Sequence, residues 1–103
     1  MSIDFKKKFS YTHTMKKIFG ERLKSERLKN GELQSDLAKI LNVDISMVSL
    51  WENGKNYPEV KKLIEISEHY RISTDYLLGL INTPNDKIYN DFKYNQGTIN
   101  NKF

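Results

Sequence analysis

The sequence predicts a small all-α domain, and three observations support that prediction. Between residues 18 and 80, apolar residues recur with the three- and four-residue spacing of helices that bury one face. Helix-stopping pairs such as Asn30-Gly31 and Asn53-Gly54 divide this pattern into short segments. No segment alternates apolar and polar residues as a strand does, and none is repeated. We therefore expect a compact bundle of five helices, with flexible N- and C-terminal tails, in a chain of 103 residues.

The first two predicted helices precede a tight turn. The first covers residues 18–29 and points Phe19, Leu23 and Leu28 toward the core. The second covers residues 34–41. Asn42 follows it, where we expect the chain to turn through the left-handed conformation that Asn tolerates better than most residues.

The last three predicted helices each carry a start signal. Asp44 is a good N-cap for the third helix, which covers residues 45–52. Pro58 opens the fourth helix, because its fixed φ suits the first helical turn. Ser73 caps a short fifth helix.

The chain divides into a helical domain, residues 18–80, and two tails. Residues 1–17 form a basic N-terminal tail, and Met15 is an alternative start of the natural chain. Residues 81–103 form an Asn-rich C-terminal tail, in which a short helix over residues 84–94 is the alternative to disorder.

The net charge of +4 suggests a nucleic-acid partner, but its distribution weakens that argument. The first 17 residues carry +4, whereas residues 18–80 carry −1. The lysines of the N-terminal tail are most simply solvated, and an arm that grips DNA is the alternative. Charge alone therefore does not establish DNA binding.

The composition excludes several functional classes. The chain has no Cys, which excludes a disulfide scaffold, thiol catalysis and thiolate metal sites. His13 and His69 lack ligand-spaced partners and the acidic residues are scattered, so we expect no metal, no cofactor and no enzyme. No apolar run has membrane-spanning length, and the N-terminus lacks the apolar centre of a secretory signal. A soluble cytoplasmic protein with no membrane partner is the expectation.

Residues 34–55, QSDLAKILNVDISMVSLWENGK, are the most informative segment. They are interpreted as a short helix, a tight turn and a second short helix. In the helix over residues 45–52, Val48 and Trp51 mark the inward side. The opposite, outward face then has no structural role of its own. That face consists of Ile45, Ser46, Ser49 and Leu50. Proteins insert a short helix of this kind into the DNA major groove.

Three stretches of the chain resemble the Cro/repressor-type helix-turn-helix family, often called XRE. They are FGERLKSERLKNG at 19–31, the 34–55 segment, and YPEVKKLIEISEHYRISTDYLLG at 57–79. The resemblance covers about residues 18–80 and implies a lambda-repressor-like DNA-binding domain. Its expected partner is double-stranded DNA, bound at a palindromic operator by a homodimer.

The resemblance implies a role for individual residues. The four residues of the outward face match base-contacting positions, which agrees with their predicted exposure. The positions that match phosphate contacts are Gln34, Asn53, Lys55, Asn56 and Arg27. Arg27 and Glu52 also match a structural ion pair. The chain departs from the family pattern at Leu33, where a small polar N-cap is usual, and at Arg71, where Gly commonly ends the fourth helix.

We expect a sequence-specific transcriptional regulator, a repressor of phage, mobile-element or chromosomal type. Surplus apolar surface near the fifth helix supplies candidates for the dimer interface, Tyr76, Leu78 and Leu80. The alternative is a protein-interaction module, such as an antitoxin or anti-regulator, that binds another protein through the C-terminal tail. Tyr89, Phe92 and Tyr94 are the tail aromatics that it would use.

Overall fold

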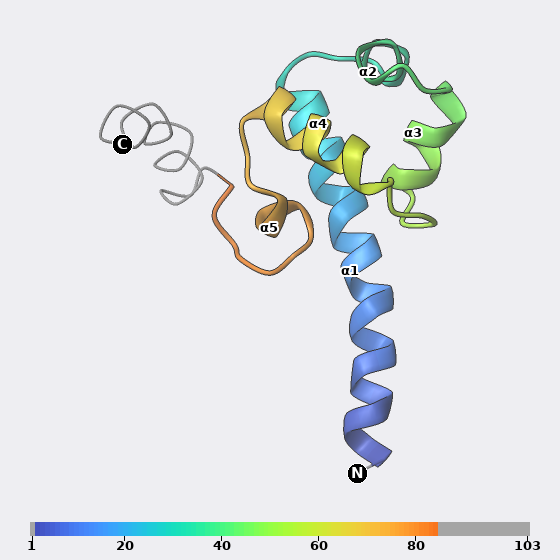
Figure 1. Ribbon diagram of the computed structural model, residues 1–103, viewed down its shortest axis with the longest axis vertical. Coiled ribbons are helices and arrows are strands. Elements are labelled where there is room, and N and C mark those ends of the chain that lie inside the picture. Colours follow the sequence, from blue (N-terminus) through green and yellow to red (C-terminus); the bar gives the residue numbers. More distant parts are fainter. Residues whose placement is uncertain (1, 85–103) are drawn as a thin grey trace, which may run out of the picture.

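The computed structural model describes the backbone of residues 2–84 and the side chains of residues 14–84. All regular structure in this part is helical (Figure 1). The elements are α1 (Ser2–Lys29), α2 (Gln34–Leu41), α3 (Ile45–Glu52), α4 (Val60–Tyr70) and α5 (Thr74–Leu77). The prediction of an all-α domain with five helices is confirmed. The short helix considered for the C-terminal tail falls almost entirely beyond residue 84, outside the described residues.

The first helix is longer than the sequence predicted. Helix α1 begins at Ser2 rather than at residue 18, and Figure 1 shows its N-terminal half extending away from the other helices. No Gly or Pro interrupts residues 2–19, so the stretch contains no strong helix breaker. The apolar spacing did not reveal this part, because a helix without a core to cover carries no apolar stripe. In the part of the chain that the structure describes, no helix has the length and apolar character needed to cross a membrane.

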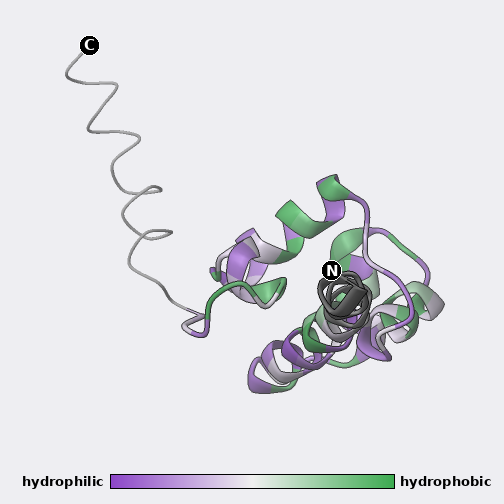
Figure 2. Ribbon diagram, turned by 90° about the horizontal axis from the view of Figure 1, so that it is seen from below, coloured by the Kyte–Doolittle hydropathy of each residue, from purple (hydrophilic) through white to green (hydrophobic). Residues whose placement is uncertain are grey.

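The core lies where α1, α2 and α3 meet, with α4 and α5 closing it. Each helix carries hydrophilic and hydrophobic residues, as expected of helices that bury one face (Figure 2). The largest fully buried side chains are Trp51, Phe19, Leu23, Leu37, Leu41, Ile66, Leu77 and Val48. Burying each aliphatic side chain of this size stabilises the fold by about 1.5–3 kcal/mol, so this cluster is the main source of stability.

The helix ends follow the sequence signals except at the starts of α3 and α4. Helix α4 begins at Val60, after the N-cap Glu59, so the prediction that Pro58 opens this helix is wrong: Pro58 precedes its first turn. Asn42 has φ of 56°, which confirms the predicted left-handed turn between α2 and α3. The hydroxyl of Ser73 accepts a hydrogen bond from the Tyr76 N–H at 3.0 Å, which confirms the predicted N-cap of α5. Asp44 occupies the N-cap position of α3, but its side chain makes no capping hydrogen bond. Asp44 is therefore the N-cap residue that the sequence predicted, but its carboxylate does not cap the helix.

Phe19 and Leu23 lie on the inner face of α1 as predicted, but Leu28 does not. Leu28 is 58% exposed, whereas Glu26 and Arg27 are 7% and 6% exposed. Leu23 is fully buried, and the residue four positions later lies on the same side of the helix, which directs Arg27 inward and Leu28 outward. Leu28 was placed in the core because it is apolar, but the helical spacing decides its position.

Gly20 allows α1 and α3 to approach closely. A Cβ atom at this position would lie 2.4 Å from the carbonyl oxygen of Trp51 and 2.7 Å from that of Glu52. Both atoms belong to the backbone, so they cannot move aside as a side chain would. The absence of a side chain at Gly20 thus fixes the C-terminal end of α3 against α1.

Arg22 fastens the end of the domain to α1. Its guanidinium donates to the carbonyl oxygens of Tyr76 and Ile81, the latter at 2.8 Å. It also lies 4.1 Å from the centre of the Tyr76 ring and donates to Asn82 Oδ1 at 3.2 Å. One side chain of α1 therefore contacts both α5 and the residues after it, in addition to the packing of Leu77 in the core.

Candidate nucleic-acid interface

The outward face of α3 has the exposure that the sequence predicted. Val48 and Trp51 are 0% and 1% exposed, and they fix the orientation of this eight-residue helix. On the opposite side Ile45 is 50% exposed and Leu50 is 38% exposed. Ser46 is exposed and Ser49 is half-exposed. The face therefore presents two apolar groups and two hydroxyls to the surroundings.

The turn after α3 continues this surface. Gly54 has φ of +71°, a left-handed conformation that glycine adopts without strain. The Lys55 N–H then donates to the Leu50 carbonyl at 3.0 Å, which closes the helix. Lys55 and Asn56 are exposed beyond this turn. Two of the predicted phosphate-contacting side chains are thus available next to α3.

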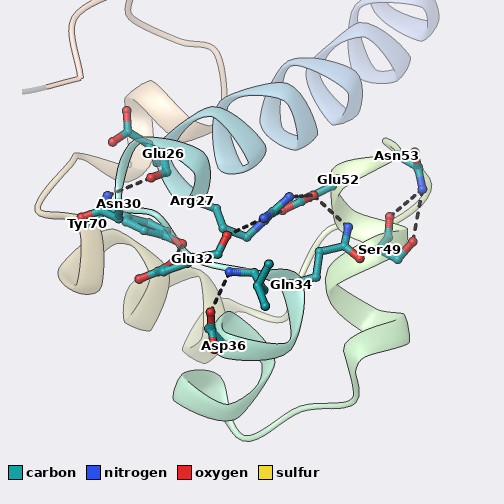
Figure 3. Close-up of polar contacts among 11 residues, drawn as sticks. Glu26, Arg27, Asn30, Glu32, Gln34, Asp36, Ser49, Glu52, Asn53 and Tyr70 are labelled. Atoms are coloured by element: carbon teal, nitrogen blue, oxygen red, sulfur yellow. Dashed lines mark hydrogen bonds and ion pairs between the residues drawn. The ribbon is translucent and has the colours of Figure 1, made fainter.

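Asn53 has a structural role within α3. Its Nδ2 donates to the Ser49 carbonyl at 2.9 Å and lies 3.3 Å from Ser49 Oγ (Figure 3). The side chain therefore caps the helix end, while the residue itself stays exposed. The hydroxyl of Ser49 accepts from Asn53 and keeps its own O–H to donate elsewhere.

Arg27 and Glu52 form the ion pair that the sequence predicted. Arg27 Nε lies 2.6 Å from Glu52 Oε2, and Nη2 lies 3.0 Å from Oε1 (Figure 3). The two side chains are only 7% and 2% exposed. The hydrogen bonds from Arg27 to Glu52 raise the pKa of the arginine above its usual value. The pair joins the end of α1 to the end of α3.

The same geometry turns Arg27 away from solvent. Its Nη1 donates to the carbonyl oxygen of Glu32 at 2.7 Å, so all three guanidinium nitrogens have partners inside the domain. The whole residue is 6% exposed. The structure therefore does not bring Arg27 to the surface with the other predicted phosphate contacts.

Gln34 lies at the start of α2, beside the buried ion pair. Its Nε2 donates to Glu52 Oε1 at 3.0 Å, so the side chain is held against α3 (Figure 3). Leu33 offers no side-chain cap, but the carboxylate of Asp36 accepts from the Leu33 N–H at 2.7 Å. A carboxylate in the first turn also interacts favourably with the helix dipole. Asp36 thus compensates in part for the missing polar cap.

Glu32 makes contacts that the sequence did not predict. Its Oε1 accepts from the Tyr70 hydroxyl at 2.6 Å, and its Oε2 lies 2.6 Å from His69 Nε2. His69, which lacked an identifiable partner in the sequence, is therefore paired across the fold. Burial, together with the hydrogen bond to Glu32, raises the pKa of the Tyr70 hydroxyl. Because these residues are 37 and 38 positions from Glu32, no local spacing could have indicated the cluster.

The three candidates for the dimer interface differ in exposure. Leu80 is 53% exposed, whereas Leu78 and Tyr76 are half-buried. Tyr76 packs partly against the core and under the guanidinium of Arg22. Leu80 is therefore the apolar side chain of this group that is most available to another molecule.

Comparison with known families identifies the class of protein to which this fold and surface belong. A family model described as helix-turn-helix matches residues 23–77, which is more than half of the chain. The chain belongs to this helix-turn-helix family, and the resemblance to Cro/repressor-type proteins is confirmed.

Three relatives are proteins with regulatory names. The HTH-type transcriptional regulator ImmR of Bacillus subtilis (strain 168) is 40% identical over 60 residues, which cover 58% of this chain and 47% of ImmR. The HTH-type transcriptional activator BcrR of Enterococcus faecalis is 36% identical over 61 residues, covering 59% of this chain and 30% of BcrR. Repressor protein C2 of Salmonella phage P22 is 33% identical over 61 residues, covering 59% of this chain and 28% of C2. The similarity thus spans less than half the length of each of these relatives.

Proposed function

We propose that the protein is a sequence-specific DNA-binding transcriptional regulator that inserts α3 into the major groove. The observation that carries this proposal is the exposed face of α3, which the buried Val48 and Trp51 hold in one orientation. Membership of the helix-turn-helix family and the regulatory names of the relatives support it. A cytoplasmic protein that contains no enzyme site is the corresponding expectation.

The base edges are read by Ile45, Ser46, Ser49 and Leu50. Apolar side chains contact thymine methyl groups, and short hydroxyls make single hydrogen bonds to base edges. The face lacks the Arg or Gln that would form bidentate pairs with guanine or adenine. We therefore expect modest direct readout, with A·T-rich sequence and DNA shape contributing to specificity.

The phosphate contacts come from both ends of the motif. Lys55 and Asn56 approach the backbone from the turn after α3, and Asn53 contributes while it caps the helix. Gln34 lies at the N-terminus of α2, and its Nε2, which donates one hydrogen to Glu52, keeps a second N–H for a phosphate. Arg27 is not included, because the residue is only 6% exposed and each guanidinium nitrogen donates inside the domain.

The protein acts as a homodimer on a palindromic operator. A single domain offers few base contacts, so two copies on half-sites about 34 Å apart are needed for specificity. Leu80 supplies the most exposed apolar contact between the copies, with Leu78 and Tyr76 adding their exposed edges.

Repression is the proposed mode of regulation, since a bound dimer blocks polymerase from an overlapping promoter. The name of the phage P22 repressor supports this mode, whereas the name of BcrR describes an activator. A reporter gene under the recovered operator tests the sign: repression lowers its expression in the presence of the protein, and a rise would contradict the proposal.

Selection from a random DNA pool, followed by sequencing at two salt concentrations, tests the function itself. We expect recovery of a palindrome with one-turn spacing at both concentrations. Weak, sequence-blind binding that disappears with added salt would contradict specific recognition, since phosphate contacts alone behave in this way. That result would favour the protein-interaction alternative, which the relatives do not support.

A further inference from the structure

The turn after α3 lies directly against the backbone of α1. A Cβ atom at Gly54 would lie 3.2 Å from Lys17 Cα, 3.5 Å from Lys17 N and 3.6 Å from the Lys16 carbonyl oxygen. One turn further along α1, Gly20 faces the last carbonyl groups of α3. The backbone of α1 therefore packs directly against the end of α3 and against the turn, with no side chain between them at Gly20 and Gly54.

This contact places a lysine of α1 beside the turn that carries Lys55. Lys17 is exposed and Lys16 is half-buried, while Lys55 is exposed one residue after Gly54. Within residues 14–84, no carboxylate lies at ion-pair distance from the Lys17 ammonium. Helix α1 continues on the N-terminal side to Ser2, so Lys17 lies inside a helix rather than at its end.

We propose that Lys17 is a further DNA-phosphate contact, and that the backbone-binding surface continues from the turn after α3 onto α1. The inference rests on the proposed function, and its partner is the phosphate backbone of double-stranded DNA. The backbone of Lys17 lies against Gly54 and Lys55 follows Gly54 directly, and both lysines are exposed, so DNA that reaches this turn meets positive charge from two elements. The sequence predicted that the lysines at the start of the chain are solvated. This proposal instead assigns one of them, Lys17, a contact with DNA.

A structural role is the competing explanation for Lys17. The C-terminal end of α3 carries partial negative charge, and a nearby lysine stabilises such an end without any DNA. The two explanations predict different results, because one changes the stability of the free protein and the other changes the salt dependence of DNA binding.

The test compares Lys17→Gln, Lys29→Gln and Lys55→Gln with the unchanged full chain on one DNA duplex over a series of salt concentrations. Lys29→Gln is the matched control, since it removes the same charge from the same helix twelve residues away, where Lys29 pairs with Glu26 at 3.2 Å. Lys17→Gln and Lys55→Gln are each expected to weaken binding several-fold at low salt. Each should also lower the slope of log K against log salt by about 0.9, the value for one phosphate contact.

The outcomes separate this inference from the proposed function. Equal binding by Lys17→Gln and Lys29→Gln, with Lys55→Gln weakened, overturns the role of Lys17 and leaves the proposed function intact. Loss of stability in Lys17→Gln without a change in salt slope also overturns it, in favour of the structural role. Absence of DNA binding by the unchanged chain overturns both proposals.

A positional probe provides a second measurement. Because the chain has no Cys, Lys17→Cys and Lys29→Cys each introduce a single attachment point for a thiol-linked iron chelate. Hydroxyl radicals from the chelate at position 17 are expected to cut the DNA backbone beside the bound motif, and those from position 29 are not. Equal cutting from both positions would contradict the placement of Lys17 at the backbone.

Discussion

Arg27 and Glu52 are charged, yet their side chains are only 7% and 2% exposed. A buried ion pair is tolerated when its hydrogen bonds are satisfied, and here Arg27 reaches Glu52 twice and the Glu32 carbonyl once. The family resemblance predicted the pair but not its depth. The burial of the two side chains could not be predicted from the sequence, because it depends on how α1, α3 and the connection before α2 pack together.

Tyr70 gives a prediction about pH. Its pKa is raised by burial and by the hydrogen bond to Glu32, so the folded protein keeps the phenol proton above the unfolded pKa of about 10. The associated stability is fully present below that pH and is lost as the pH rises, by up to about 1.4 kcal/mol per pH unit. Urea denaturation between pH 7 and 11 should therefore show that Tyr70→Phe loses less stability with rising pH than the unchanged protein does.

The same variant should be less stable at pH 7 by roughly 1–2 kcal/mol, because Glu32 loses a partially buried hydrogen-bond donor. The other tyrosines are present in both proteins, so the comparison isolates Tyr70. Parallel stability curves for the two proteins above pH 9 would contradict the shifted pKa of this residue.

Among the elements, α2 and α3 were predicted with the bounds that the structure shows, whereas α1 was not. The motif helices are short, strongly patterned and limited by Asn42 and the Asn53-Gly54 pair, so local sequence defines them. The start of α1 carries neither a stop signal nor an apolar stripe. A prediction that searches for buried apolar faces therefore misses such a segment.

The contact between α1 and α3 gives a prediction at this scale. Gly20→Ala should destabilise the protein by about 1–3 kcal/mol, since the new Cβ would overlap the carbonyl groups of Trp51 and Glu52. Helix propensity alone would instead make Gly20→Ala more stable, by up to about 1 kcal/mol. Ser25→Ala, at an exposed position of the same helix, is the control and should be neutral or slightly stabilising. Urea denaturation followed by Trp51 fluorescence provides the measurement, and a stabilised Gly20→Ala variant would contradict the close approach.

At the scale of the whole molecule, the proposed dimer depends on the end of the domain, which Arg22 holds against α1. Leu80→Lys places a charge on the most exposed apolar residue of the candidate interface. We expect this variant to sediment as a monomer and to bind a palindrome about 10²-fold more weakly, because the avidity of two linked half-sites is lost. Val60→Lys, at a residue that is 71% exposed elsewhere, should leave the dimer intact. If Leu80→Lys is still a dimer, the proposed interface is contradicted and the dimer forms through another surface.

Base recognition by α3 is the central claim, and the binding of Leu50→Ala to every single-base variant of the selected operator tests it most directly. The proposal predicts a change of roughly 1–3 kcal/mol in preference at particular base pairs, because a thymine-methyl contact is removed. Lys55→Ala, measured in parallel, should weaken all variants about equally. The same uniform loss in both proteins would contradict the assignment of Leu50, and with it the placement of α3 in the major groove.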